Sequence, residues 1–171
     1  MIYLAKPTSR REIRMAANLV RKIQGDEGLY FDIMRFLEQT LPIIQPGFSL
    51  CVKPKQEMGE CHGLTFPEQK EIWLREDIYD GAMEGKGRDR LTAAHELFHL
   101  LFHAKNQIGF ARTGGGEIPA YKNPEWQADA FGGELLIPYD KAMHLTIPQI
   151  IVSCGVSEKA ARFQFRKMHS M

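Results

Sequence analysis

The sequence has few cysteines, and their spacing suits neither a disulfide framework nor a metal site. Cys51, Cys61 and Cys154 are odd in number and form no C-x-x-C pair. Cysteine ligands for zinc usually come in such pairs, and small secreted domains usually carry an even set of cysteines. We therefore expect a reduced, cytoplasmic protein in which cysteine does not ligate a metal.

The sequence also lacks a long apolar run and a strong net charge. No apolar stretch approaches the roughly 18 residues that could cross a membrane. The first residues, Met1–Pro7, are too short and wrongly ordered for a signal peptide. The formal net charge of +1 argues against binding nucleic acid through bulk electrostatics. We expect no membrane contact and no direct DNA binding.

The composition is that of an ordinary globular protein, with 44% hydrophobic and 25% charged residues in 171. A chain of this length can bury well over half of its surface, so we expect residues 1–171 to form one domain. The residue patterns predict an α+β fold that is mostly helical, with a small antiparallel three-stranded sheet. The predicted strands are Phe48–Lys53, Gly59–Phe66 and Glu71–Leu74.

Two helices are expected before the sheet and a loop after it. Ser9–Ile23 is amphipathic and starts with a capping box, and a second helix should span Phe31–Gln39 and end in a loop at Pro42. Asp77–Arg90 is polar and holds three glycines, so we expect a loop with at most one helical turn. The first helix should expose a basic face made of Arg10, Arg11, Arg14, Arg21 and Lys22.

The clearest functional signal is H-E-x-x-H at residues 95–99, inside the predicted helix Leu91–Ala104. Residues four apart share one helix face, so His95 and His99 can point at one ion. Glu96 lies about 100° round the helix, where it can reach a water without being a ligand. The helix is apolar nearly all round, and its polar groups need a partner when buried. We predict a zinc ion with one position open for water.

The third ligand should come from the segment Asn123–Pro138. It predicts a helix with Asn as N-cap and Pro at the first helical position, ended by a second Pro. Glu125 and Asp129 are four residues apart and share a face. We predict that Glu125 binds the metal and that Asp129 accepts an N–H from a ligating histidine. Two other carboxylates remain alternatives for the third ligand: Glu117 and Glu134.

Other polar side chains could also lie near the metal. His62 lies on the predicted strand Gly59–Phe66, which we expect at the sheet edge beside the metal, where a substrate peptide could add as a strand; a surface position suits this His better. His103 should cap its helix or hydrogen-bond a neighbour. The Tyr121 phenol could stabilise a tetrahedral oxyanion, or simply pack. The link Lys105–Lys122 contains three consecutive glycines and suits a lid or a poorly ordered loop.

Two motifs in this order resemble the ImmA/IrrE family of zinc metallopeptidases. The first is H-E-L-F-H at 95–99, and the second is E-W-Q-A-D-A-F from Glu125, followed by E-L-L-I-P from Glu134. Members of the family carry an H-E-x-x-H helix followed by a helix of the type E-x-x-A-N-x-F-A-x-x-L-L-x-P. Asp129 stands where the family more often has Asn, and Gly132-Gly133 replace a more helix-prone pair.

The resemblance implies an endopeptidase whose substrate is a helix-turn-helix transcriptional repressor, often encoded alongside. In such a site zinc lowers the pKa of a water, and Glu96 takes its proton and passes it to the leaving amine. The alternative is a non-catalytic anti-repressor module that binds a repressor or antitoxin and holds a structural zinc. A structural site has no use for Glu96, so the residues favour the peptidase.

The segment 147–168 predicts two helices about a turn at Gly155, an arrangement similar to a helix-turn-helix motif. Arg162, Arg166 and Lys167 could contact phosphate there. The segment is short and the whole chain is nearly neutral, so we expect these helices to serve packing and not DNA readout.

Overall fold

The computed structural model describes residues 2–103, 108–111 and 117–170. In chain order its elements are β1 (Ile2–Ala5), α1 (Arg10–Gln24), α2 (Ile33–Arg35), η1 (Phe36–Thr40), α3 (Leu41–Ile44), β2 (Ser49–Lys53), α4 (Lys55–Met58), β3 (Gly63–Phe66), β4 (Glu71–Arg75), α5 (Glu76–Met83), α6 (Gly87–Phe102), β5 (Ile108–Ala111), η3 (Ala120–Lys122), α7 (Pro124–Leu136), α8 (Tyr139–Ala142), α9 (Ile147–Cys154) and α10 (Glu158–His169). The α+β, mostly helical fold class is confirmed.

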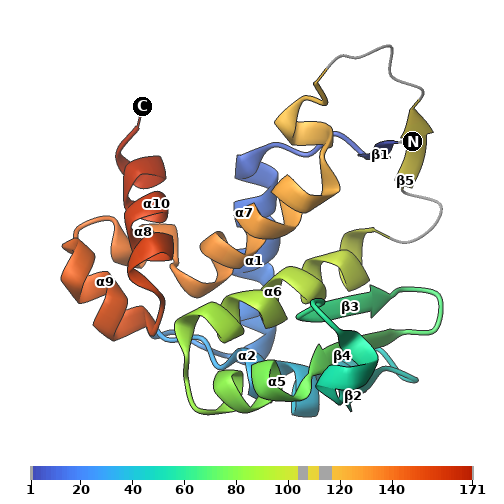
Figure 1. Cartoon of the computed structure of the whole chain (residues 1–171). Coiled ribbons are helices and arrows are strands. Elements are labelled where there is room, and N and C mark those ends of the chain that lie inside the picture. The colour runs from blue at the N-terminus through green and yellow to red at the C-terminus, as the bar shows by residue number, and fades with distance from the viewer. Residues whose placement is uncertain (1, 104–107, 112–116, 171) are drawn as a thin grey trace.

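Helices α6 and α7 lie at the centre of the molecule and pack against each other (Figure 1). Their buried side chains include Leu97, Phe98 and Phe131, and the rings of Phe98 and Phe131 are 4.9 Å apart. Helix α1 packs on α7, while β3, β4 and α5 pack on α6. These neighbours explain why α6 is apolar on nearly every side. They also fix the two helices that carry the predicted metal ligands.

Local signals set the starts of α1 and α7 as predicted. At the start of α1 the Ser9 N–H donates to the Glu12 carboxylate at 2.7 Å, and the Ser9 side chain accepts from the Glu12 N–H. At the start of α7 the Asn123 side chain accepts from the backbone N–H groups of Glu125 and Trp126 at 2.9 and 3.3 Å. The α7 cap therefore fixes the turn on which Glu125 lies.

The three-stranded sheet is mixed, and the prediction that it is wholly antiparallel is wrong. Its strand order is β2-β4-β3; β3 pairs with β4 antiparallel, and β2 pairs with β4 parallel. The reason is the link between β2 and β3, residues 54–62, which contains the helical turn α4 and is too long for a hairpin. The chain therefore returns with β4 between the other two strands. Strand β3 is an edge strand of this sheet, as predicted, and packs on α6.

Two predicted loops are helical. The helix expected to end before Pro42 continues through a π-helical turn into α3, where Pro42 occupies the first turn and needs no hydrogen-bond donor. Helix α5 fills much of Asp77–Arg90. Its Gly81 does not break the helix; a Cβ there would lie 1.8 Å from the Asp89 carboxylate, so glycine permits α5 and α6 to approach.

The basic face of α1 is only partly exposed, contrary to the prediction. Arg21 is 5% exposed and donates to the backbone carbonyls of Leu135, Gly28 and Leu29 at 2.7, 3.0 and 2.9 Å. The guanidinium supplies donors for carbonyls that have no helical partner. A charged residue in an amphipathic pattern therefore lies in the core because distant backbone groups meet it there.

The two C-terminal helices form about the turn at Gly155, which has a φ of +63°. Arg90 of α6 is 1% exposed and donates to the Cys154 carbonyl at 2.8 Å, to the Gly155 carbonyl and to the Phe31 carbonyl. This side chain ties the turn to α6. The buried face of α10 includes Ala161, Gln164 and Met168.

The remaining predictions concern cysteines and membranes. All three cysteines are free, and Cys154 is buried. Across the described ranges, no helix combines the length and the apolar character that crossing a membrane requires. Strands β1 and β5 pair antiparallel within the N-terminal and linker regions. The glycine run 114–116, predicted as part of a lid or a poorly ordered loop, lies outside the described residues.

Candidate metal centre

His95 and His99 of α6 meet Glu125 of α7 at the surface between the two helices. The Nε2 atoms of the histidines are 3.0 Å apart; His95 Nε2 lies 3.1 Å from Glu125 Oε2, and His99 Nε2 lies 3.1 Å from Glu125 Oε1. Zinc ligands at about 2.0–2.1 Å in a tetrahedron are separated by roughly 3.3 Å, so each of these three separations is close to what one ion needs. Two imidazoles and a carboxylate also suit zinc chemically. The predicted residues are brought together and fit a single divalent ion.

Asp129, one turn further along α7, holds the His95 ring. Its carboxylate lies 2.7 Å from His95 Nδ1, so the ring donates Nδ1–H and keeps the Nε2 lone pair for a metal. Burial alone would lower the pKa of His95, but hydrogen bonds to Asp129 and Glu125 outweigh it and raise the pKa to about 10. Hydrogen bonds from His95 and His99 hold the pKa of the Glu125 carboxyl well below its usual range. A bound cation would replace the proton between His95 and Glu125.

A chain of hydrogen bonds through His103, which was expected to hydrogen-bond a neighbour, holds the His99 ring; Gln127 is the member of the chain that was not predicted. His103 Nδ1 lies 2.7 Å from His99 Nδ1, and His103 Nε2 lies 2.7 Å from Gln127 Oε1. The Gln127 amide donates to the backbone carbonyls of Lys6 and Tyr121, both at 2.8 Å, so its oxygen must accept. His103 then donates to Gln127 and accepts from His99 Nδ1–H, so Nε2 is the His99 nitrogen that can face a metal. Burial lowers the pKa of His103 to about 4, which keeps this ring neutral.

Glu96 is 7% exposed and is positioned by the edge strand β3. The Thr65 hydroxyl lies 2.5 Å from a Glu96 carboxylate oxygen and 3.1 Å from the Glu96 carbonyl. At Gly63 a Cβ would lie 2.8 Å from Glu96 Cγ, so only glycine permits this close approach. Sequence reasoning missed both residues. A glycine inside a predicted strand was the available signal for such an approach.

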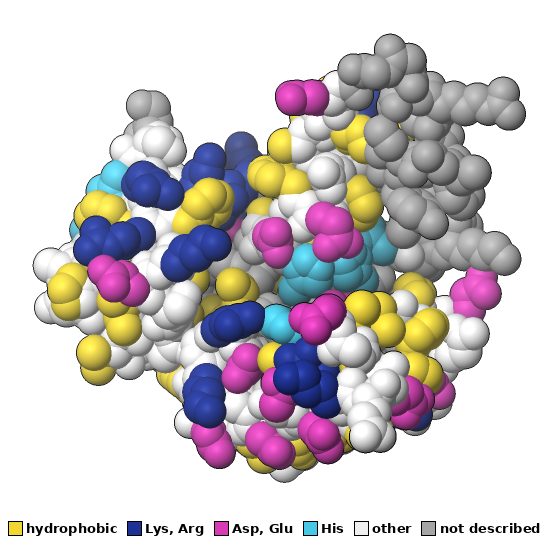
Figure 2. Space-filling view, in the orientation of Figure 1, with side chains coloured by type: hydrophobic (Ala, Val, Ile, Leu, Met, Phe, Trp, Pro, Cys, Tyr) yellow, Lys and Arg dark blue, Asp and Glu magenta, His cyan; other side chains and the backbone are white. Residues whose placement is uncertain are grey.

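A hollow of about 410 Å³ opens beside these groups, lined among others by His62, His95, Glu96 and Asp129. Figure 2 shows the histidines reaching the surface with acidic side chains beside them. His62 thus lies near the centre but outside the three-residue ligand group. Tyr121 lies in η3 and is 47% exposed; its phenol as an oxyanion donor stays a prediction.

The two alternative carboxylates are placed elsewhere. Glu134 is 1% exposed and pairs with Arg10 and Arg14 at 3.0 and 3.1 Å. Glu117 is exposed. Within the described part of the chain, the group able to hold a metal contains neither of them. Glu125 is therefore the carboxylate that the geometry favours.

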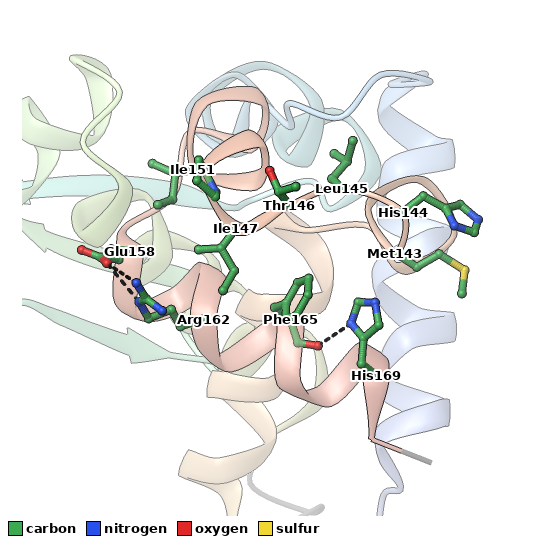
Figure 3. Close-up of a pocket in the computed structure, with 11 residues that line it drawn as sticks. Met143, His144, Leu145, Thr146, Ile147, Ile151, Glu158, Arg162, Phe165 and His169 are labelled. Carbon is green, nitrogen blue, oxygen red and sulfur yellow. Dashed lines mark hydrogen bonds and ion pairs between the residues drawn. The ribbon is translucent and has the colours of Figure 1, made fainter.

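A second hollow of about 470 Å³ lies between α9 and α10 (Figure 3). Its walls include Ile147, Ile151 and Phe165, and Arg162 at its edge is turned toward Glu158, which it contacts at 2.8 Å. One of the three cations considered for DNA contact is thus engaged within its own helix. That the helix pair serves packing stays a prediction.

Comparison with known proteins confirms the resemblance to the ImmA/IrrE family. A family model described as the IrrE N-terminal-like domain, Peptidase_M78, matches residues 56–165. This range contains β3, α6, α7 and most of α10. It therefore includes the ligand group and the side chains that hold it; the Lys6 carbonyl, which accepts from Gln127, lies outside it. A search of curated proteins finds no match. Because the matched range exceeds half of the chain, this protein belongs to the IrrE N-terminal-like family of peptidases.

Proposed function

We propose that the protein is a zinc-dependent endopeptidase that cleaves a helix-turn-helix transcriptional repressor or antitoxin. The position of Glu96 is the observation that favours hydrolysis. Glu96 lies next to the ligand His95 but outside the ligand group, lines the open hollow, and is held by Thr65. A carboxylate in this position has a role in moving a proton and no role in holding the ion.

The residues of the centre would have separate roles in peptide hydrolysis. Zinc would polarise the scissile carbonyl and acidify a water. Glu96 takes the proton of the attacking water and delivers it to the leaving amine, while the Thr65 hydroxyl fixes the orientation of its carboxylate. Asp129 and His103 hold the two imidazole rings so that Nε2 faces the ion. Strand β3, at the edge of its sheet, offers backbone groups to which an extended substrate can add.

We propose a repressor as the substrate because the two motif helices of this chain resemble those of the ImmA/IrrE family. The competing function is a non-catalytic module that binds the repressor without cutting it. It would need the zinc ligands but not Glu96, so a single substitution separates the two functions.

The test is the substitution Glu96→Gln, which keeps size and removes the basic oxygen. Purified parent and variant, each with and without zinc, are incubated with the repressor-like protein encoded next to this chain. Loss of a general base typically costs about 10²–10⁴-fold in rate, so we expect that fall in cleavage, with binding and zinc content retained. Glu117→Gln, an exposed carboxylate outside the centre, serves as the matched control. If Glu96→Gln relieves repression in cells as well as the parent does, the protein acts by binding.

A further inference from the structure

A groove of about 740 Å³ runs between α10 and the pair α6 and α7. It shares Arg88, Leu91 and Asp129 with the hollow that contains Glu96. Groove and hollow therefore adjoin, and Asp129, which holds the His95 ring, stands where they meet. The volume is that of a site for a ligand or a few peptide residues.

The floor of this groove carries two buried donors without partners. Gln164 is 1% exposed, and its Oε1 accepts from Arg10 Nη2 at 2.6 Å. Gln164 Nε2 and Arg10 Nη1 are both buried, and neither has a hydrogen-bond partner within the described residues. Both side chains line the groove. An unsatisfied buried donor costs free energy, so a ligand that offers acceptor oxygens here gains more than a surface hydrogen bond would give.

Helix α7 leaves this floor uncovered because it has glycine at position 133. A Cβ at Gly133 would lie 3.0 Å from Gln164 Oε1 and 3.8 Å from Arg10 Nη2. A larger side chain would press against the ends of the two side chains that carry the donors. The preceding Gly132 has a different use, since a Cβ there would lie 2.8 Å from Leu91 of α6. Gly132 thus permits close packing of α7 against α6, and Gly133 leaves the groove open.

The rim of the groove is positively charged. Arg88, Lys159 and Arg166 line it, are exposed, and make no ion pair with any described residue. Figure 2 shows Lys and Arg side chains gathered over the α10 side of the molecule, facing the histidines across the hollow. Because the whole chain carries a net charge of only +1, this is a local concentration of positive charge.

We propose that this groove binds an acidic segment of the protein substrate. A Glu or Asp carboxylate accepts hydrogen bonds from Arg10 Nη1 and Gln164 Nε2 on the floor, and neighbouring acids pair with the rim. The position of this segment beside the scissile bond rests on the proposed peptidase function. A flexible side chain can reach the buried donors, whereas phosphates of a stiff DNA duplex would meet the rim alone; the floor therefore favours a peptide.

Binding of labelled peptides, read by fluorescence anisotropy, tests this directly. The probe is a ten-residue peptide of alternating Glu and Ala, compared with matched Gln and Lys peptides, on the full chain with one equivalent of zinc. We expect the Glu peptide to bind most tightly. Lys159→Gln plus Arg166→Gln should weaken it about tenfold, since each exposed pair contributes a few-fold. The matched control, Arg162→Gln plus Lys167→Gln, removes the same charge from the same helix outside the groove and should change nothing.

The floor is tested by Gln164→Met, which keeps the length of the side chain and removes the donor. This variant should weaken binding of the Glu peptide more than binding of the Gln peptide. Circular dichroism checks that the variant folds. If it does not fold, the rim variants test the proposal by themselves. Equal binding of Glu and Gln peptides, or equal loss in the control pair, overturns the proposal. So does tighter binding of a duplex DNA that is lost in the same rim variants. Because the readout is binding, failure of the peptidase proposal would leave these results unchanged.

Discussion

Near its first turn α7 presents Glu125 to His95 and His99, and near its last turn it presents Glu134 to Arg10 and Arg14. Each carboxylate meets nitrogen atoms from two side chains at about the same distance, 3.1 Å in one case and 3.0–3.1 Å in the other. The Glu125 side chain is 67% exposed, whereas that of Glu134 is fully buried.

The two clusters differ in whether their nitrogen groups can give up a proton. Imidazole can give up its Nε2 proton and then offers a lone pair, so a divalent ion can take the place of the proton beside Glu125. Guanidinium stays charged and has no acceptor, so Glu134 is already neutralised and no ion can enter. The same arrangement of a carboxylate between two nitrogens is thus able to hold a metal at one end of α7 and forms a structural ion pair at the other.

The largest effect should come from breaking the structural cluster. Glu134→Ala leaves two partly buried guanidinium groups unpaired, and we expect the free energy of unfolding to fall by about 3 kcal/mol. Glu125→Ala, in an exposed cluster, should cost less than about 1 kcal/mol in metal-free protein. Urea unfolding of both variants and the parent, with a chelator present, measures the two losses. Equal losses would mean that α7 uses both carboxylates for its fold.

A smaller effect should come from the hydrogen bonds that hold the metal histidines. Gln127→Leu removes the acceptor for His103 and so loosens the His99 ring, and loss of such outer partners typically costs about 10–100-fold in metal affinity. Competition with a chromogenic chelator gives the zinc affinity. Gln69→Leu, at an exposed position in the β3–β4 turn, is the control. An affinity unchanged by Gln127→Leu would show that His99 needs no support from this chain.

The sequence was sufficient for features that depend on local spacing. The four-residue separations of His95 from His99 and of Glu125 from Asp129 place each pair on one helix face, whatever the rest of the fold does. The N-cap at Asn123 likewise fixes the start of α7 from its own residues. These local rules predicted the residues that the structure brings together.

Features that depend on distant partners could not be read from the sequence. Arg21 is polar in an amphipathic helix, yet it is buried because the Leu135 carbonyl, 114 residues away, meets it. The bond between His103 and Gln127 and the bond between Thr65 and Glu96 also join separate elements. The parallel pairing of β2 with β4 depends on where α4 directs the chain. In each case the partner is set by packing, which no local pattern encodes.

We expect His95, His99 and Glu125 to hold one divalent ion, while Glu134 stabilises the fold. Zinc content per chain, measured on the parent and on His99→Ala after dialysis against equal zinc, tests it most directly. We expect one zinc per parent chain and a loss of the ion from His99→Ala, with the variant still folded. Full retention of zinc by His99→Ala would mean that the ion is held by other residues.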